Sequence, residues 1–166
     1  GEIAFNTIGD AHIARQIMAI RNIVTLGDDV LRKVCRTQLT FDERLWTVLD
    51  DMKDTMEQAE GVGLAAVQVG ILKRVCIVDV GDGLIELVNP VIVEQSGSQT
   101  GGEGCLSSPG EYGNVTRPME VTVRAQDRNG NDTDLFYTPL YYPDNGPETT
   151  ELRKTLSKKK NPLAEA

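Results

Sequence analysis

One apolar stripe early in the chain has the periodicity of a helix and constrains the fold more than any other feature. Its members recur at intervals of four, three and four residues: Leu45, Leu49, Met52 and Met56. Side chains at this spacing share one face of an α-helix, so the stripe predicts a helix that packs on a core and runs to about residue 59. Thr40 and Glu43 have the spacing of a capping box and predict its start. A shorter helix is expected over about 28–36, where Asp28 precedes apolar residues.

The segments after this helix have β character. Valine and isoleucine are frequent in 74–80, 84–93 and 115–125. Asn129 and Gly130 form a hairpin-turn dipeptide between 121–125 and 134–137. Helices followed by hairpin-connected strands predict an α+β fold, with antiparallel sheets packed with helices, rather than a parallel α/β fold. No internal repeat is present, so one domain is expected over 18–136, and 1–17 is interpreted as an N-terminal extension.

The pattern changes near residue 137. Pro139, Pro143 and Pro147 lie within nine residues. One proline in a helix interior costs about 3 kcal/mol, so no helix is expected through 137–147. We therefore predict that 137–166 is a divergent, irregular tail, in which only 148–159 has a composition that a short helix tolerates.

Charge and cysteine usage exclude several classes of protein. The formal net charge of −8 argues against a nucleic-acid partner or an anionic membrane surface. No segment approaches the roughly 20 apolar residues of a membrane span. Cys35, Cys76 and Cys105 are odd in number and lack close pairing, which favours a reducing compartment over a disulfide framework. Cys35 and Cys76 are interpreted as small buried hydrophobes.

Two glycine-containing segments carry the residues that suit chemistry. Residues 103–109 read Glu-Gly-Cys-Leu-Ser-Ser-Pro, a loop in which Cys105 can present a thiolate to a metal. Residues 61–70 read Gly-Val-Gly-Leu-Ala-Ala-Val-Gln-Val-Gly, where the amide of Gln68 can donate to a developing oxyanion. The second segment also fits a dinucleotide-binding fingerprint, but that site requires a preceding strand where this sequence predicts a helix.

Together, and in this order, the two segments resemble the first two motifs of the peptide deformylases. These metal hydrolases remove the N-formyl group from newly made proteins. The resemblance runs from about Met18 to Phe136 and implies the deformylase fold. It implies that Cys105 is a metal ligand and that Gln68 and the backbone N–H of Leu106 stabilise the tetrahedral oxyanion. It also implies substrate contacts from three glycines: Gly61, Gly63 and Gly104.

The same resemblance suggests the cofactor and the partners. The implied metal is Fe²⁺, and Zn²⁺, Ni²⁺ or Co²⁺ also suit a thiolate ligand. The implied substrates are N-formylated nascent peptides, and contact with the ribosome stays open. The location would be the bacterial cytoplasm or an organelle, where translation begins with formylmethionine.

The third motif of the family, His-Glu-x-x-His on a helix, is absent. The sequence has one histidine, His12, and residues 136–143 read Phe-Tyr-Thr-Pro-Leu-Tyr-Tyr-Pro. A catalytic metal site needs about three protein ligands, so Cys105 alone does not retain a metal with useful affinity. His12 is expected at the surface. Three carboxylates are conceivable replacement ligands, but carboxylates are poor partners for a soft thiolate site: Glu103, Asp132 and Asp134. The metal-binding helix is therefore interpreted as lost or replaced.

These observations predict an impaired or inactive deformylase. Two alternatives remain. One is a non-catalytic, deformylase-like protein that binds peptide N-termini or a protein partner. The other is a cysteine hydrolase with Cys105 as nucleophile, which would require His12 as its base. Loss of a helix should also expose apolar sheet and favour association.

Overall fold

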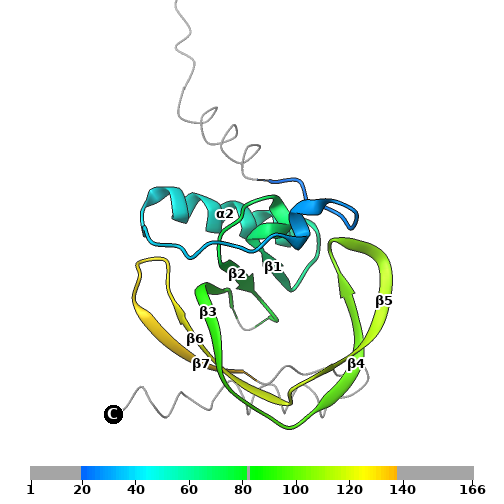
Figure 1. Cartoon of the computed structure of the whole chain (residues 1–166). Helices are drawn as coiled ribbons and strands as arrows, with labels where there is room; N and C mark the ends of the chain where they lie inside the picture. The colour runs from blue at the N-terminus through cyan, green and yellow to red at the C-terminus, as the bar shows by residue number, and fades with distance from the viewer. Residues whose placement is uncertain (1–19, 82, 138–166) are drawn as a thin grey trace, which may run out of the picture.

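A computed structural model describes residues 20–81 and 83–137 (Figure 1). The first half holds a 3₁₀ turn η1, one α-helix and two short elements: η1 Asp29–Arg32, α2 Glu43–Gln58, β1 Gly63–Ala65 and η2 Ala66–Val69. Six strands follow: β2 Val75–Val78, β3 Ile85–Ser96, β4 Gln99–Cys105, β5 Ser108–Arg117, β6 Glu120–Gln126 and β7 Asp132–Tyr137. The predictions for 1–17, His12, 138–147 and 148–159 concern residues outside the described ones.

The strands form two antiparallel sheets. The larger has the order β1-β2-β3-β6-β7, and β4 pairs with β5 in a separate two-stranded sheet. In Figure 1, α2 lies across the β1–β2 end of the larger sheet, while the β4–β5 hairpin extends away and curves back toward the N-terminal part of the chain. The predicted α+β class with antiparallel sheets is confirmed. The part of the chain with assigned placement contains no helix with the length and hydropathy that a membrane span requires.

The apolar stripe of α2 forms the core, as predicted. Its four members are at most 1% exposed, and they pack with sheet residues that include Leu64, Ile77 and Val88. The predicted start of the helix is wrong, because Asp42 rather than Thr40 is the N-cap. The Asp42 carboxylate accepts hydrogen bonds from the amides of Arg44 and Leu45, at 3.1 and 3.3 Å, and so satisfies the first turn directly.

The helix predicted over 28–36 is only the 3₁₀ turn η1. Asp28 caps it as expected, since its carboxylate accepts a hydrogen bond from the Val30 amide at 2.9 Å. The turn contains no buried residue, however, and the backbone is already extended at Lys33. Arg36 then pairs with the Lys73 region, with its amide bonded to the Leu72 carbonyl at 3.0 Å. Backbone pairing with a distant segment therefore outweighs local helix preference here.

The β prediction is correct in part. β2 and β3 lie where 74–80 and 84–93 predicted strands, but 115–125 is divided between β5 and β6. The break includes Pro118, which has no N–H for a ladder hydrogen bond, and the strands on its two sides belong to different sheets. The glycine-rich stretch that forms β4 was not predicted as a strand. Three adjacent residues of β3 remain 41–57% exposed: Val91, Ile92 and Val93.

The hairpin predicted at Asn129-Gly130 joins β6 to β7. The Asp127 carboxylate accepts hydrogen bonds from the amides of Asn129 and Asn131, and Gly130 has a φ of 84°. This turn lies against the residue just before the N-cap of α2, because a Cβ on Gly130 would lie 3.1 Å from the Phe41 ring. Both the turn conformation and the close approach therefore require glycine at this position.

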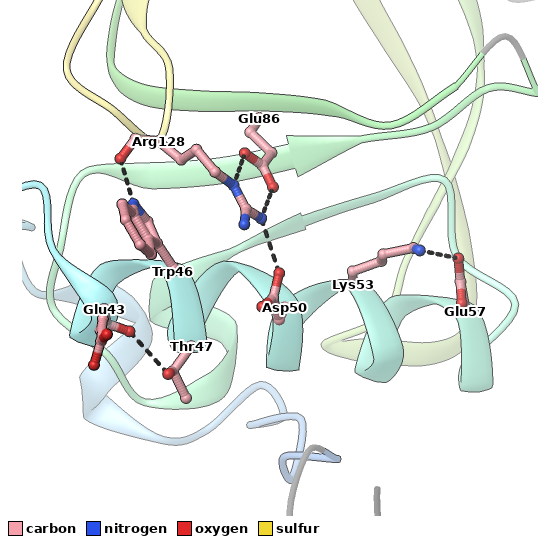
Figure 2. A network of polar contacts seen from close by, with 8 residues as sticks. All are labelled: Glu43, Trp46, Thr47, Asp50, Lys53, Glu57, Glu86 and Arg128. Carbon is pink, nitrogen blue, oxygen red and sulfur yellow. Dashed lines mark hydrogen bonds and ion pairs between the residues drawn. The ribbon is translucent and has the colours of Figure 1, made fainter. Parts of the chain in front are cut away.

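Figure 2 shows how the same turn is fixed to the helix. The Trp46 indole N–H donates to the Arg128 carbonyl at 2.7 Å. The Arg128 guanidinium bonds both oxygens of Glu86 and also lies 2.8 Å from an Asp50 oxygen. These hydrogen bonds, first those with Glu86, raise the pKa of Arg128 above its ordinary value, so the guanidinium stays charged.

Removing the Arg128 side chain should therefore destabilise the fold. We expect Arg128→Ala to lower the free energy of unfolding by about 1–2 kcal/mol, because a charge-assisted bidentate contact is lost at a partly exposed site. Urea unfolding followed by circular dichroism measures the change. Lys53→Ala is the matched control, since Lys53 is 3.8 Å from Glu57 on the exposed face of α2 and should cost less than about 0.5 kcal/mol. An equal loss in both variants would contradict this anchoring role.

Candidate active site

A cleft of 670 Å³ lies where the two glycine-containing segments meet. All six residues predicted from the sequence line it: Gly61, Gly63, Gln68, Gly104, Cys105 and Leu106. The two segments are far apart in the sequence, and they come together because the β4–β5 hairpin curves back toward the first of the described residues (Figure 1). The location of the predicted site residues in one cleft is thus observed, while their chemical roles remain predictions.

The first segment supplies a fixed amide. Gln68 lies on η2, which ends at Gly70 with a φ of 79°, a left-handed conformation that glycine adopts without strain. The Gln68 Oε1 accepts a hydrogen bond from the Ala65 amide at 2.9 Å. Its Nε2 lies 3.1 Å from Ser107 Oγ and 3.8 Å from Cys105 Sγ. The donor end of the amide therefore faces the second segment.

The second segment forms the tip of the β4–β5 hairpin. β4 ends at Cys105 and β5 begins at Ser108, so Leu106 and Ser107 form the connecting turn. The three side chains at this tip differ in exposure. Cys105 is exposed to the cleft, Leu106 is half-buried against the core, and Ser107 is only 3% exposed. The hairpin thereby presents the thiol and secures the turn beneath it.

Two of the three predicted substrate-contacting glycines have close neighbours in the protein itself. A Cβ on Gly61 would lie 2.6 Å from Leu106 Cδ1, so this glycine lets the two segments touch. A Cβ on Gly104 would lie 3.0 Å from the Tyr112 ring. At Gly63 the nearest atom would be the Ile77 carbonyl oxygen, at an ordinary 3.6 Å. Packing therefore accounts for Gly61 and Gly104, and it leaves Gly63 without a steric requirement.

The segment 21–26 bonds to both motifs, and this role was not predicted from the sequence. The Val24 amide donates to the Gln68 carbonyl at 2.7 Å, and the Leu26 amide donates to the Ser107 carbonyl at 2.8 Å. Arg21 fixes the segment to α2 by a contact of 2.6 Å with Asp51. Backbone hydrogen bonds such as these require no particular residue type, so the sequence does not reveal them. Ser107 was noted in the sequence only as a member of the 103–109 motif, with no role of its own.

The carboxylates named as substitute metal ligands do not complete a metal site. Glu103 binds Arg117 through both oxygens, at 2.7 and 2.9 Å, and these hydrogen bonds lower its pKa. Asp134 is similarly paired with Arg124. Within residues 20–81 and 83–137, no three histidine, cysteine or acidic side chains cluster closely enough to hold a metal. The donor set that the structure describes therefore does not fit a catalytic metal.

The other two cysteines lie away from this chemistry. Cys76 is on β2, and burial raises the pKa of its thiol to about 11, which keeps it protonated and inert at neutral pH. Cys35, which was expected to be buried, is only half-buried. Neither lines the cleft.

Comparison with known proteins identifies the family. The family described as Polypeptide deformylase matches residues 20–138. Among curated relatives, the chain is 55% identical to a peptide deformylase of Caldicellulosiruptor bescii over 115 residues, and this alignment covers 69% of each chain. It is 58% identical over 113 residues to the peptide deformylase of Acetivibrio thermocellus, across 68% of this chain and 66% of the relative. The matches thus span about two thirds of these relatives' length.

Solved structures agree with the sequence comparison. A peptide deformylase from Thermotoga maritima superposes with a TM-score of 0.71 at 36% identity, across 72% of this chain and 82% of that one. A peptide deformylase from Legionella pneumophila gives a TM-score of 0.70 at 36% identity, across 89% of this chain and 99% of that one. On the fold, the two motifs and these matches, the chain belongs to the polypeptide deformylase family.

Proposed function

We propose that this chain recognises N-formylmethionyl peptides as a deformylase-type amide hydrolase, and that hydrolysis is impaired in the sequence as printed. One observation carries the proposal. The Gln68 Nε2 lies 3.8 Å from Cys105 Sγ in a cleft that the two family motifs line. The Gln68 amide and the Cys105 thiol come from distant segments, and their separation is short enough for one bound carbonyl group to contact both.

The chain's own residues account for carbonyl recognition. The Gln68 amide and the Leu106 backbone N–H are the proposed donors to the formyl oxygen. Loss of one such donor costs about 3 kcal/mol in transition-state stabilisation. β1 is the edge strand of the larger sheet, and Gly61 and Gly63 lie beside the cleft at that edge. An extended peptide can therefore add to this edge through backbone hydrogen bonds.

The metal is the part of the family chemistry that the described residues do not support. Members of the family use a divalent cation, for which Fe²⁺ is the first candidate and Cys105 the proposed ligand. The sequence holds one histidine and no His-Glu-x-x-His. A lone thiolate is too few ligands for a retained catalytic ion, and for this reason the proposal includes impaired turnover.

The lack of a ligand cluster also favours a second candidate function. A deformylase-like protein without turnover would still bind the N-termini of formylated peptides through the same cleft. Both functions predict peptide binding, and they differ in whether formate is released.

A peptide-binding experiment tests both. We expect formyl-Met-Ala-Ser to shift the amide signals of Gln68 and Leu106 in a titration followed by nuclear magnetic resonance, and unformylated Met-Ala-Ser to bind at least about tenfold more weakly, because one carbonyl acceptor is missing. Formate release is measured on the same samples with added Fe²⁺ or Ni²⁺. Binding with slow release supports the proposal, and binding with no release supports the non-catalytic function. Equal binding of the two peptides would refute both.

A further inference from the structure

The side chain of Gln68 is held at both ends, and the two contacts differ in kind. The Ala65 backbone N–H can only donate, so it selects the oxygen end of the amide, Oε1, at 2.9 Å. The nitrogen end must then point the other way, where Ser107 Oγ lies 3.1 Å from Nε2. One amide N–H donates to the Ser107 hydroxyl, and Nε2 also donates to Cys105 Sγ, at 3.8 Å on the cleft side.

The Ser107 hydroxyl is itself held in place. Ser107 is 3% exposed, so water does not compete freely for its hydroxyl. Its carbonyl accepts from the Leu26 amide, and the Gln68 carbonyl accepts from the Val24 amide. Val24 and Leu26 are two residues apart, so one short stretch of chain bonds both motifs. That segment sets the separation of Gln68 from Ser107.

From this arrangement we infer that Ser107 is a positioning residue, whose hydroxyl aims the other N–H of Gln68, the one that faces Cys105 Sγ, at the substrate carbonyl. The inference rests on the proposed function, because it assumes that a formyl oxygen is the acceptor. The terminal torsion of glutamine has a broad energy profile and does not fix the amide by itself. Without the hydroxyl, only the Ala65 contact and the long 3.8 Å contact with Cys105 Sγ restrain the amide, and Nε2 swings away from the cleft.

The side-chain amide signals of Gln68 test the inference on the peptide-free protein. They are assigned by their disappearance in Gln68→Glu. We expect Ser107→Ala to speed exchange of the Gln68 side-chain amide hydrogens with water by about tenfold, because a partly buried hydrogen bond is lost. It should also weaken the cross-relaxation between this side chain and the Ala65 amide. Formyl-Met-Ala-Ser affinity should fall about fivefold to tenfold, while unformylated peptide is unaffected.

Matched variants separate positioning from folding. Ser96→Ala removes a serine hydroxyl at the exposed far end of β3, where it contacts Glu120, and should leave every Gln68 signal unchanged. Ser107→Cys keeps about the same side-chain size but replaces the hydroxyl with a weak acceptor. It therefore tests the positioning role if Ser107→Ala does not fold. Unchanged Gln68 exchange in whichever Ser107 variant folds overturns the inference, and so does faster exchange with unchanged formyl-peptide affinity. If the unaltered protein binds no formyl peptide, the proposed function fails. The exchange data then still show whether the Ser107 hydroxyl holds the Gln68 side chain.

Discussion

Replacing residues 138–166 with the C-terminal segment of the Acetivibrio thermocellus relative should raise deformylation of formyl-Met-Ala-Ser by about 1000-fold or more. By family resemblance, that segment carries the His-Glu-x-x-His helix that this sequence lacks. Metal activation of water contributes several kcal/mol to such reactions, and about 4 kcal/mol corresponds to a 1000-fold rate change. The two proteins are 58% identical over the aligned 113 residues, so the new segment meets a similar partner surface. Formate release by the chimera and by the unaltered chain is the measurement.

Controls show whether the gain uses the cleft described above. The chimera should bind about one metal ion per chain by elemental analysis, whereas the unaltered chain should bind far less. Cys105→Ser in the chimera should remove most of the gain if the thiol is a ligand. A chimera that binds metal but releases no formate would show that the Gln68 and Cys105 side of the cleft is not catalytically competent. Rapid release by the unaltered chain would show that the ligand count is wrong.

The sequence predicted features that depend on composition within a short window. The α2 stripe and the hairpin at Asn129-Gly130 are of this kind, and each is found where it was predicted. The segment 103–109 was predicted as a loop, but only Leu106 and Ser107 lie outside β4 and β5. The motif residues were also correctly grouped, because all six line one cleft. That grouping came from resemblance to a family. Spacing alone would not have brought Gln68 close to Cys105.

The errors arise where distant backbone contacts decide the structure. The stretch 28–36 has a good helix start, but pairing of Arg36 with the Lys73 region ends the turn early. β4 is rich in glycine, which has low β propensity, yet its ladder with β5 is satisfied in full register from Gln99 to Gly104. The segment 21–26 acts through backbone amides, which every residue except proline carries. Single-sequence patterns contain no signal for such contacts.

Asn89 illustrates the same limit, and its substitution should have the largest effect on stability. It lies within β3 with a φ of 51°, at a register shift between Val88 and Val91. Its side chain bonds both the amide and the carbonyl of Gln38, each at 2.8 Å, and donates to Gln126 as well. Gln38 is 7% exposed, so water cannot fully replace these partners. A single asparagine thus joins the segment before α2 to two strands of the larger sheet.

We expect Asn89→Ala to lower the free energy of unfolding by about 3–4 kcal/mol. Unpaired buried backbone groups of Gln38 account for about 2 kcal/mol, and the left-handed conformation adds about 1–2 kcal/mol for a residue other than glycine or asparagine. Asn89→Gly removes the same hydrogen bonds without the backbone strain and should cost about 1–2 kcal/mol less than the alanine variant. Urea unfolding of both variants measures the two contributions separately. Equal losses would show that the backbone at this position is unstrained, and losses below about 0.5 kcal/mol would show that the Asn89 side chain does not hold the register shift.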